Sequence, residues 1–115
     1  MNYEIIVGGK IFNNMEKINS IQIKEKLDKN ETFLLKIFAV WCLPCRQLTE
    51  ELNKIRTDIP IYEFDVESDI DFSKKLGVRN VPVLKFYKEG VDTHTMVGLK
   101  PAQTVSSLIL EYINN

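Results

Sequence analysis

The sequence predicts an α/β fold in which a central mixed β-sheet is flanked by helices. Over the first two thirds of the chain, apolar strand-like segments alternate with amphipathic helical segments, which is typical of parallel strands joined by helices. The last third has the pattern of two strands joined by a tight turn and followed by a helix, which adds an antiparallel hairpin. With 115 residues, the chain is short enough to form one domain.

The N-terminal segment has the weakest pattern. Residues 3–12, YEIIVGGKIF, fit two short strands joined by Gly8-Gly9, or an edge strand with an irregular lead-in. We therefore assign residues 1–12 to an N-terminal extension, with an extra strand or a hairpin, and residues 13–115 to the domain itself.

The domain is expected to open with a short strand and a helix. The strand is MEKI at residues 15–18. Ser20 is a suitable N-cap because a serine side chain can accept a hydrogen bond from the first turn, and the helix is predicted to run to about Lys29.

A nearly continuous apolar segment follows. TFLLKIFAV at residues 32–40 is typical of a central strand that is covered on both faces. Leu48, Leu52 and Ile55 then recur at i, i+4 and i+7, with charged residues between them. This spacing predicts an amphipathic helix from about Pro44 to Arg56.

A second strand and a short helix come next. IPIYEFDV at residues 59–66 contains alternating apolar positions and predicts a strand. Ser68 or Asp69 can cap the following helix, and Gly77 is expected to end it because glycine readily adopts the left-handed conformation.

The C-terminal third predicts a hairpin and a closing helix. VLKFY at 83–87 and DTHTMV at 92–97 are joined by a turn at Glu89-Gly90, where glycine supplies a positive φ. Pro101 is expected to open the last helix. One stripe of that helix is apolar: Val105, Leu108, Ile109, Tyr112 and Ile113.

The composition is that of an ordinary globular protein. Hydrophobic residues make up 44% and charged residues 27% of the chain, which excludes a disordered chain, a collagen-like fibre and a disulfide-dense scaffold. The net charge of −1 predicts no attraction to nucleic acid or to an anionic membrane. The longest apolar run, Ile37–Leu43, is too short to span a membrane, and no basic region precedes an apolar one at the start. We therefore expect a cytoplasmic protein.

The two cysteines lie together at the junction between the central strand and the following helix, in Trp41-Cys42-Leu43-Pro44-Cys45. A reducing compartment disfavours a permanent structural disulfide. A helix N-terminus favours an anion, so Cys42 is expected to ionise more readily than a free thiol. Because only two residues separate the cysteines in the first turn, their sulfurs can come within bridging distance.

At these positions the sequence resembles the thioredoxin family, and the similarity extends from Asn13 to Asn115. It is carried by three segments and one glycine: Phe38-Ala39-Val40-Trp41-Cys42-Leu43-Pro44-Cys45, Gly77-Val78-Arg79-Asn80-Val81-Pro82, Val97-Gly98 and Gly90. The resemblance implies a thioredoxin fold, with Cys42 as an exposed nucleophile and Cys45 as a more buried resolving thiol. It also implies a cis peptide between Val81 and Pro82.

The resemblance further implies a thiol–disulfide oxidoreductase that reduces protein disulfides by dithiol exchange. Such an enzyme needs no cofactor and no metal besides the redox-active disulfide. Its implied partners are disulfide-containing client proteins and a thioredoxin reductase that donates electrons, and we expect a monomer. The client-binding residues carried over from the family are Trp41, Leu43, Pro44, Val81, Pro82, Val97 and Gly98.

The sequence departs from the family at two places near the cysteines. Most thioredoxins have a buried aspartate where this chain has Lys36, and the lysine that faces it is replaced by Glu63. A Lys36–Glu63 ion pair would be a charge-inverted acid/base pair beside Cys45, although Lys36 can also extend its ammonium to the end of the sheet. Leu43 stands where typical members have glycine, which adds an apolar side chain next to the nucleophile.

Other interpretations remain open at this stage. The sequence also fits a disulfide oxidant or isomerase, and a redox-independent binding or accessory subunit. Zinc is disfavoured because the single histidine, His94, has no companion ligand, and His94 is expected at the surface. Trp41 is expected to form an exposed platform rather than a core aromatic, and Pro82 can also simply mark the start of a strand.

Overall fold

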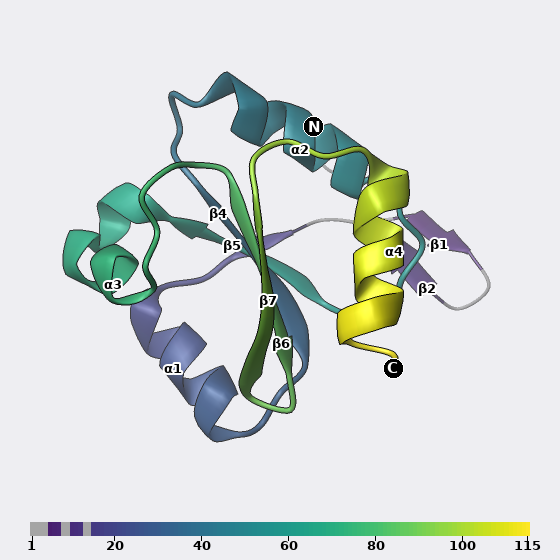
Figure 1. Ribbon diagram of the computed structural model, residues 1–115, viewed down its shortest axis with the longest axis horizontal. Helices are drawn as coiled ribbons and strands as arrows, with labels where there is room; N and C mark the ends of the chain where they lie inside the picture. Colours follow the sequence, from purple (N-terminus) through teal and green to yellow (C-terminus); the bar gives the residue numbers. More distant parts are fainter. Residues whose placement is uncertain (1–4, 8–9, 13–14) are drawn as a thin grey trace.

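The structure is a computed structural model, which describes residues 5–7, 10–12 and 15–115. Five strands form one sheet in the order β3 (Glu16–Lys17), β5 (Ile61–Asp65), β4 (Phe33–Phe38), β6 (Val83–Lys88) and β7 (Val91–Val97) (Figure 1). The strand β5 is parallel to both of its neighbours, whereas β6 is antiparallel to both β4 and β7. The predicted mixed sheet is confirmed.

Helices cover both faces of the sheet. On one face, α2 (Leu43–Leu52) and α4 (Ala102–Tyr112) pack against strand residues such as Leu34 and Phe86. On the other face, α1 (Ser20–Asp28) and α3 (Ile70–Lys75) pack against residues such as Leu35. All six residues of β4 are buried, because its side chains alternate between these two cores. The chain therefore reaches the cysteine pair from the most enclosed strand.

The prediction that Ser20 caps the first helix is wrong. The N-cap of α1 is Asn19, whose Oδ1 accepts a hydrogen bond from the Gln22 N–H at 2.8 Å. The Gln22 side chain accepts in return from the Asn19 N–H at 2.9 Å, and this reciprocal pair satisfies two helix-end donors. Ser20 instead donates its hydroxyl to Asp69 Oδ2 at 2.8 Å, which ties α1 to the start of α3.

The second helix ends earlier than its apolar spacing indicated. It stops at Leu52, four residues before the predicted end at Arg56. The Ile55 N–H still donates to the Leu52 carbonyl at 3.1 Å, so the backbone continues as a tight turn. Ile55 is buried in the same core cluster as Leu52, which explains why its spacing looked helical.

Of the two candidate caps for α3, the structure selects Asp69. Its carboxylate accepts from the Phe72 N–H at 3.0 Å, and this bond, together with the Ser20 hydroxyl, holds the pKa of Asp69 below its ordinary value. Gly77, at a φ of +78°, lies just after the helix as predicted. A short 3₁₀ turn over Val66–Ser68 was not predicted.

The turn between β6 and β7 packs closely against another part of the chain. Glu89 and Gly90 both have positive φ, at 52° and 82°. The Gly90 N–H donates to the Glu31 carbonyl at 2.9 Å, and a Cβ on Gly90 would lie 2.7 Å from the Leu27 carbonyl oxygen. Glycine is thus required here by both conformation and space.

The N-terminal extension contains β1 (Ile5–Val7) and β2 (Lys10–Phe12), which pair antiparallel in a separate two-stranded sheet. The predicted turn at Gly8-Gly9 lies outside the described residues. In the part of the chain that the structure describes, no helix is long and apolar enough to cross a membrane.

Candidate active site

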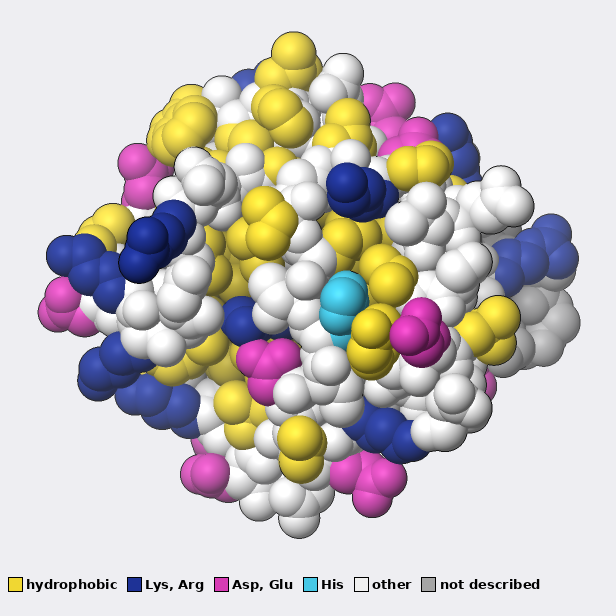
Figure 2. Space-filling view, viewed as in Figure 1, with side chains coloured by type: hydrophobic (Ala, Val, Ile, Leu, Met, Phe, Trp, Pro, Cys, Tyr) yellow, Lys and Arg dark blue, Asp and Glu magenta, His cyan; other side chains and the backbone are white. Residues whose placement is uncertain are grey.

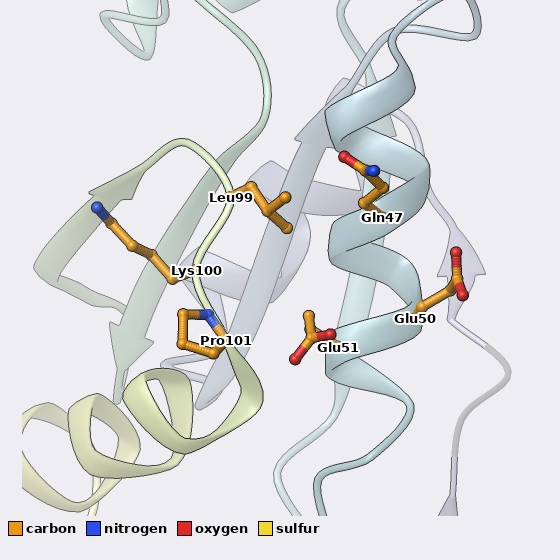
Figure 3. Close-up of a pocket in the computed structure, with 6 residues that line it drawn as sticks. All are labelled: Gln47, Glu50, Glu51, Leu99, Lys100 and Pro101. Atoms are coloured by element: carbon orange, nitrogen blue, oxygen red, sulfur yellow. The ribbon is translucent and has the colours of Figure 1, made fainter.

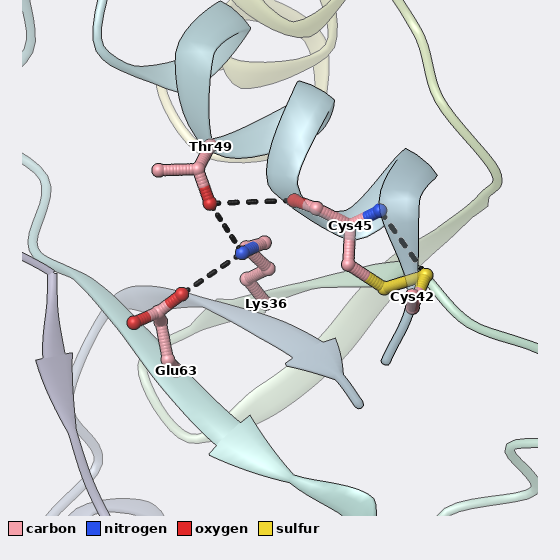
Figure 4. A network of polar contacts seen from close by, with 5 residues as sticks. All are labelled: Lys36, Cys42, Cys45, Thr49 and Glu63. Atoms are coloured by element: carbon pink, nitrogen blue, oxygen red, sulfur yellow. Dashed lines mark hydrogen bonds and ion pairs between the residues drawn. A yellow bond between two sulfur atoms is a disulfide. The ribbon is translucent and has the colours of Figure 1, made fainter. Parts of the chain in front are cut away.

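The two cysteines lie where β4 gives way to α2, and they form a disulfide with a Cα–Cα distance of 5.3 Å (Figure 4). Cys42 is the N-cap of α2, and its Sγ accepts a hydrogen bond from the Cys45 N–H at 3.1 Å. This amide donor and the positive end of the helix would both stabilise a thiolate at Cys42.

Cys42 is less accessible than expected. Its exposed fraction is 4%, and that of Cys45 is 1%. The expectation of an exposed Cys42 is therefore wrong for this disulfide form. The reason is packing: both cysteines lie in a small cluster with Phe38 and Ala39, against which Val81 packs.

Exposed apolar side chains lie next to the cysteines in the chain and at the end of β7. We call five of them the apolar rim: Val40, Trp41, Leu43, Val97 and Leu99. Trp41 is 66% exposed and donates its Nε1–H to Glu67 Oε2 at 3.2 Å, so it is a surface platform and not a core aromatic. Val40 and Leu99 were not among the predicted residues, although both are apolar positions next to predicted ones.

The loop before β6 and the end of β7 meet beside the cysteines. The peptide between Val81 and Pro82 is cis, and Pro82 is buried. The Gly98 N–H donates to the Pro82 carbonyl at 2.9 Å. Val81 packs against the cysteine cluster, so the structure brings Val81, Pro82, Val97 and Gly98 to the same end of the sheet as the disulfide.

An ion pair with a buried ammonium lies beneath α2. Lys36 and Glu63 are register partners on β4 and β5, and Lys36 Nζ is 2.9 Å from Glu63 Oε2. Lys36 is 2% exposed, so its ammonium does not extend to solvent at the end of the sheet. The network of Figure 4 continues to Cys45, because Lys36 Nζ also donates to Thr49 Oγ1 and this hydroxyl donates to the Cys45 carbonyl at 3.3 Å.

Thr49 is a site residue that sequence reasoning missed. A signal was present, since Thr49 is four residues after Cys45 on the helix and a threonine hydroxyl often bonds to the carbonyl one turn before it. The contact with Lys36, however, depends on how α2 lies across β4. Thr49 thereby joins the buried charge to the backbone of the cysteine turn.

A hollow of about 530 Å³ adjoins the rim between α2 and the connection from β7 to α4 (Figure 3). Leu99 points toward Gln47 across it. Glu51 accepts hydrogen bonds from Lys54 Nζ at 2.7 Å and from the Ala102 N–H at 2.9 Å, and both lower the pKa of Glu51. Glu51 therefore caps the first turn of α4 from a neighbouring helix.

His94 lies at the surface, as expected, but it is not fully exposed (Figure 2). It is half-buried and stacks on Tyr112 with ring centroids 4.1 Å apart. Its ring also meets Phe86 edge-on. Among the residues that the structure describes, no group of three or more His, Cys, Asp or Glu could hold a metal ion.

A cysteine pair linked as a disulfide at the start of a helix, directly after the central strand of a mixed sheet, defines a thiol–disulfide oxidoreductase. Comparison of the sequence with known protein families identifies the family of this chain. The thioredoxin family model matches residues 14–111, and the chain belongs to the thioredoxin family.

Individual relatives agree with this assignment. A thioredoxin from Rickettsia bellii is 29% identical over 96 residues, which are 80% of this chain and 88% of the relative. A thioredoxin from Chlamydia muridarum is 30% identical over 82 residues, 69% of this chain and 80% of the relative. Among solved structures, a mutant thioredoxin from Halobacterium salinarum has the same fold, with a TM-score of 0.74 at 24% identity over 87% of this chain and 95% of that one.

Proposed function

We propose that the protein reduces disulfide bonds in client proteins, with Cys42 as the nucleophile and Cys45 as the resolving thiol. The observation that carries the proposal is that Cys42 occupies the N-cap of α2, with the exposed Trp41 and Leu43 of the apolar rim on either side of it in the chain. The helix end favours the Cys42 thiolate, and the rim offers apolar contacts to a client. We place this reaction in the cytoplasm, with a thioredoxin reductase as the electron donor.

The exchange proceeds in two steps from the reduced protein. The Cys42 thiolate attacks one sulfur of the client disulfide, which forms a mixed disulfide and releases the other client sulfur as a thiolate. The Cys45 thiolate then attacks Cys42 Sγ, forming the Cys42–Cys45 disulfide and releasing the second client thiolate. Two electrons pass to the client, and its two thiolates take up two protons. The reductase returns two electrons to the cysteine pair.

The client is proposed to lie across the cysteines as an extended segment. We propose that Trp41, Leu43 and Pro44 contact one side of this segment and that Val97 and Gly98 contact the other side. The backbone at Val81, next to Pro82, can pair with the segment. Gly98 has a φ of +88° and no side chain, which allows the client backbone to approach closely.

Lys36 and Glu63 are proposed to act as positioning residues for Cys45. Its thiol must lose a proton before the second step, and the network through Thr49 puts an ionised pair beneath that residue. The ammonium of Lys36 favours negative charge at Cys45, and Glu63 keeps the ammonium in place.

Insulin reduction coupled to NADPH and a thioredoxin reductase, or to dithiothreitol, tests the proposal. The wild-type protein should accelerate insulin precipitation, and Cys42→Ser should reduce the rate to background. Cys45→Ser should instead accumulate a mixed disulfide with the client, visible by mass spectrometry. Turnover that survives in Cys42→Ser would overturn the assignment. Equilibration with glutathione separates a reductase from an oxidant or isomerase, because a reductase holds its disulfide at a lower potential.

A further inference from the structure

A second hollow, of about 240 Å³, lies beside the loop that leads into Pro82. One wall is residues 76–80, between α3 and the cis-proline, and the other is the face of the β6–β7 hairpin. Val97 lines this hollow and also belongs to the apolar rim. The hollow therefore opens next to the path proposed for the client.

Lys85 forms part of the hollow. It lies in the middle of β6 on the same sheet face as Val83 and Tyr87, and it is 6% exposed. Its Nζ donates to Asp92 Oδ2 at 2.8 Å and to Thr95 Oγ1 at 3.0 Å. An ammonium has three N–H donors, so these protein acceptors occupy two of the three.

Arg79 provides a second cation. It is exposed on the loop wall, and no described residue forms an ion pair with it. The lining of the hollow contains Arg79 and Lys85 but no carboxylate. Because Asp92 balances Lys85, the local charge is about one positive unit, presented by two cationic side chains with amide and hydroxyl groups nearby.

The surroundings increase this positive charge. Lys74 and Lys75 are exposed in the last turn of α3, directly before the loop wall, whereas the carboxylates of that helix, Asp69 and Asp71, lie at its opposite end. Figure 2 shows Lys and Arg side chains gathered on the side of the molecule that α1 and α3 occupy. The whole chain carries a net charge of −1, so this positive face is a local feature.

We propose that this hollow, named here the Arg79–Lys85 pocket, receives an acidic side chain of the client, an Asp or Glu two residues from the attacked cysteine. The inference rests on the proposed function, because it places the client along Val81. Arg79 is two residues before Val81, and an extended segment advances about 3.3 Å per residue with alternate side chains on one side. A side chain two positions from the cysteine can therefore enter the pocket, which has room for several water molecules and so for a carboxylate.

Matched peptides test the proposal on the full-length protein. Each peptide carries one intramolecular disulfide and has either Glu or Gln two positions from the attacked cysteine, on its N-terminal side in one pair and on its C-terminal side in the other. For one of these pairs, the wild-type protein should show a kcat/KM about three- to tenfold higher for the Glu peptide, the effect of a partly desolvated charge pair. Raising the salt from about 50 to about 500 mM should shrink this ratio.

Variants locate the effect. Arg79→Gln should lower the Glu/Gln ratio, and adding Lys85→Met should bring it to about one. Lys100→Gln is the matched control. Lys100 is an exposed cation that lines the hollow between α2 and the β7–α4 connection, so its substitution should leave the ratio unchanged. If the Lys85→Met variant does not fold, Arg79→Gln alone decides the test.

Two results would overturn the inference: a wild-type ratio near one for both pairs of peptides, or a Glu/Gln ratio that is the same in Arg79→Gln as in the wild-type protein. The proposed function fails separately, if the wild-type protein reduces the Gln peptides no faster than Cys42→Ser does. Reduction of Gln peptides together with a ratio of one would therefore refute the Arg79–Lys85 pocket while leaving the reductase assignment intact.

Discussion

Breaking the Lys36–Glu63 ion pair should weaken both the fold and the thiol chemistry. The two side chains meet at 2.9 Å, with 2% and 19% of their surfaces exposed. With an effective dielectric constant of about 20, the Coulomb attraction at this distance is about 6 kcal/mol, most of which is offset by the cost of taking both charges out of water. The net effect of the pair is best measured by removing each charge separately and then both together.

The two single substitutions should differ in cost. Glu63→Gln leaves the ammonium of Lys36 buried without a counter-charge, which should lower the free energy of unfolding by about 3–5 kcal/mol. Lys36→Met should cost less, about 2–3 kcal/mol, because the partly exposed Glu63 carboxylate can turn toward water. The double variant has neither charge, so no charge is left buried without a partner. We therefore expect a coupling energy of about 2 kcal/mol between the two sites.

Urea unfolding of the oxidised proteins gives these free energies, and alkylation of the reduced proteins across a range of pH reports the ionisation of the thiols. Both single variants should slow insulin reduction, and the double variant should recover part of the rate. The half-buried pair Lys26–Glu31, whose longer contact of 3.5 Å lies far from the cysteines in the chain, is the control: its coupling should stay below about 1 kcal/mol and its loss should not affect reduction. Strictly additive effects of Lys36→Met and Glu63→Gln, on stability and on rate, would refute the coupling.

Three further predictions concern the fold. Gly90→Ala should cost about 2–3 kcal/mol of unfolding free energy, because its Cβ would meet the Leu27 carbonyl, whereas Gly77→Ala, with open space around it, should cost about 1 kcal/mol; equal losses in urea unfolding would contradict the steric argument. The depressed pKa of Asp69 makes its charge stabilising above the unfolded-state pKa of about 3.9, and this stabilisation is lost as the pH falls through the lower folded-state value. The stability difference between wild type and Asp69→Asn should accordingly shrink in acid, and a constant difference would exclude the linkage. Leu48→Ala should cost about 2–5 kcal/mol through the cavity that it leaves in the core under α2; a thermal unfolding temperature equal to the wild-type value would show that the core closes over it.

Much of the site could be predicted because its main residues are neighbours in the sequence. Cys42 and Cys45 follow a continuous apolar strand and precede an amphipathic helix, so their place at a strand-to-helix junction required no knowledge of tertiary packing. The end of that helix was predicted wrongly, because burial of Ile55 preserves the apolar spacing after the helical backbone has stopped. Periodicity reports which side chains are buried, and only indirectly the conformation of the backbone.

Other features depend on how the elements pack. The contact between Lys36 and Thr49 joins a strand to a helix, and the burial of Cys42 depends on a loop nearly forty residues further along the chain, at Val81. Neither the Lys36–Thr49 contact nor the burial of Cys42 can therefore be predicted from residues that are neighbours in the sequence. The cap at Asn19 does not depend on tertiary packing, because the spacing of Asn19 and Gln22 in the sequence is that of a reciprocal helix cap.

The two edges of the main sheet are poor templates for the addition of strands from other molecules. β3 is only two residues long, so it offers few unpaired backbone groups. The register between β6 and β7 shifts between Phe86 and Tyr87, an irregularity that increases local twist, and the charged Asp92 lies on the outer strand β7 beside it. Although the apolar rim is exposed, the sheet borders thus resist aggregation through edge-to-edge pairing.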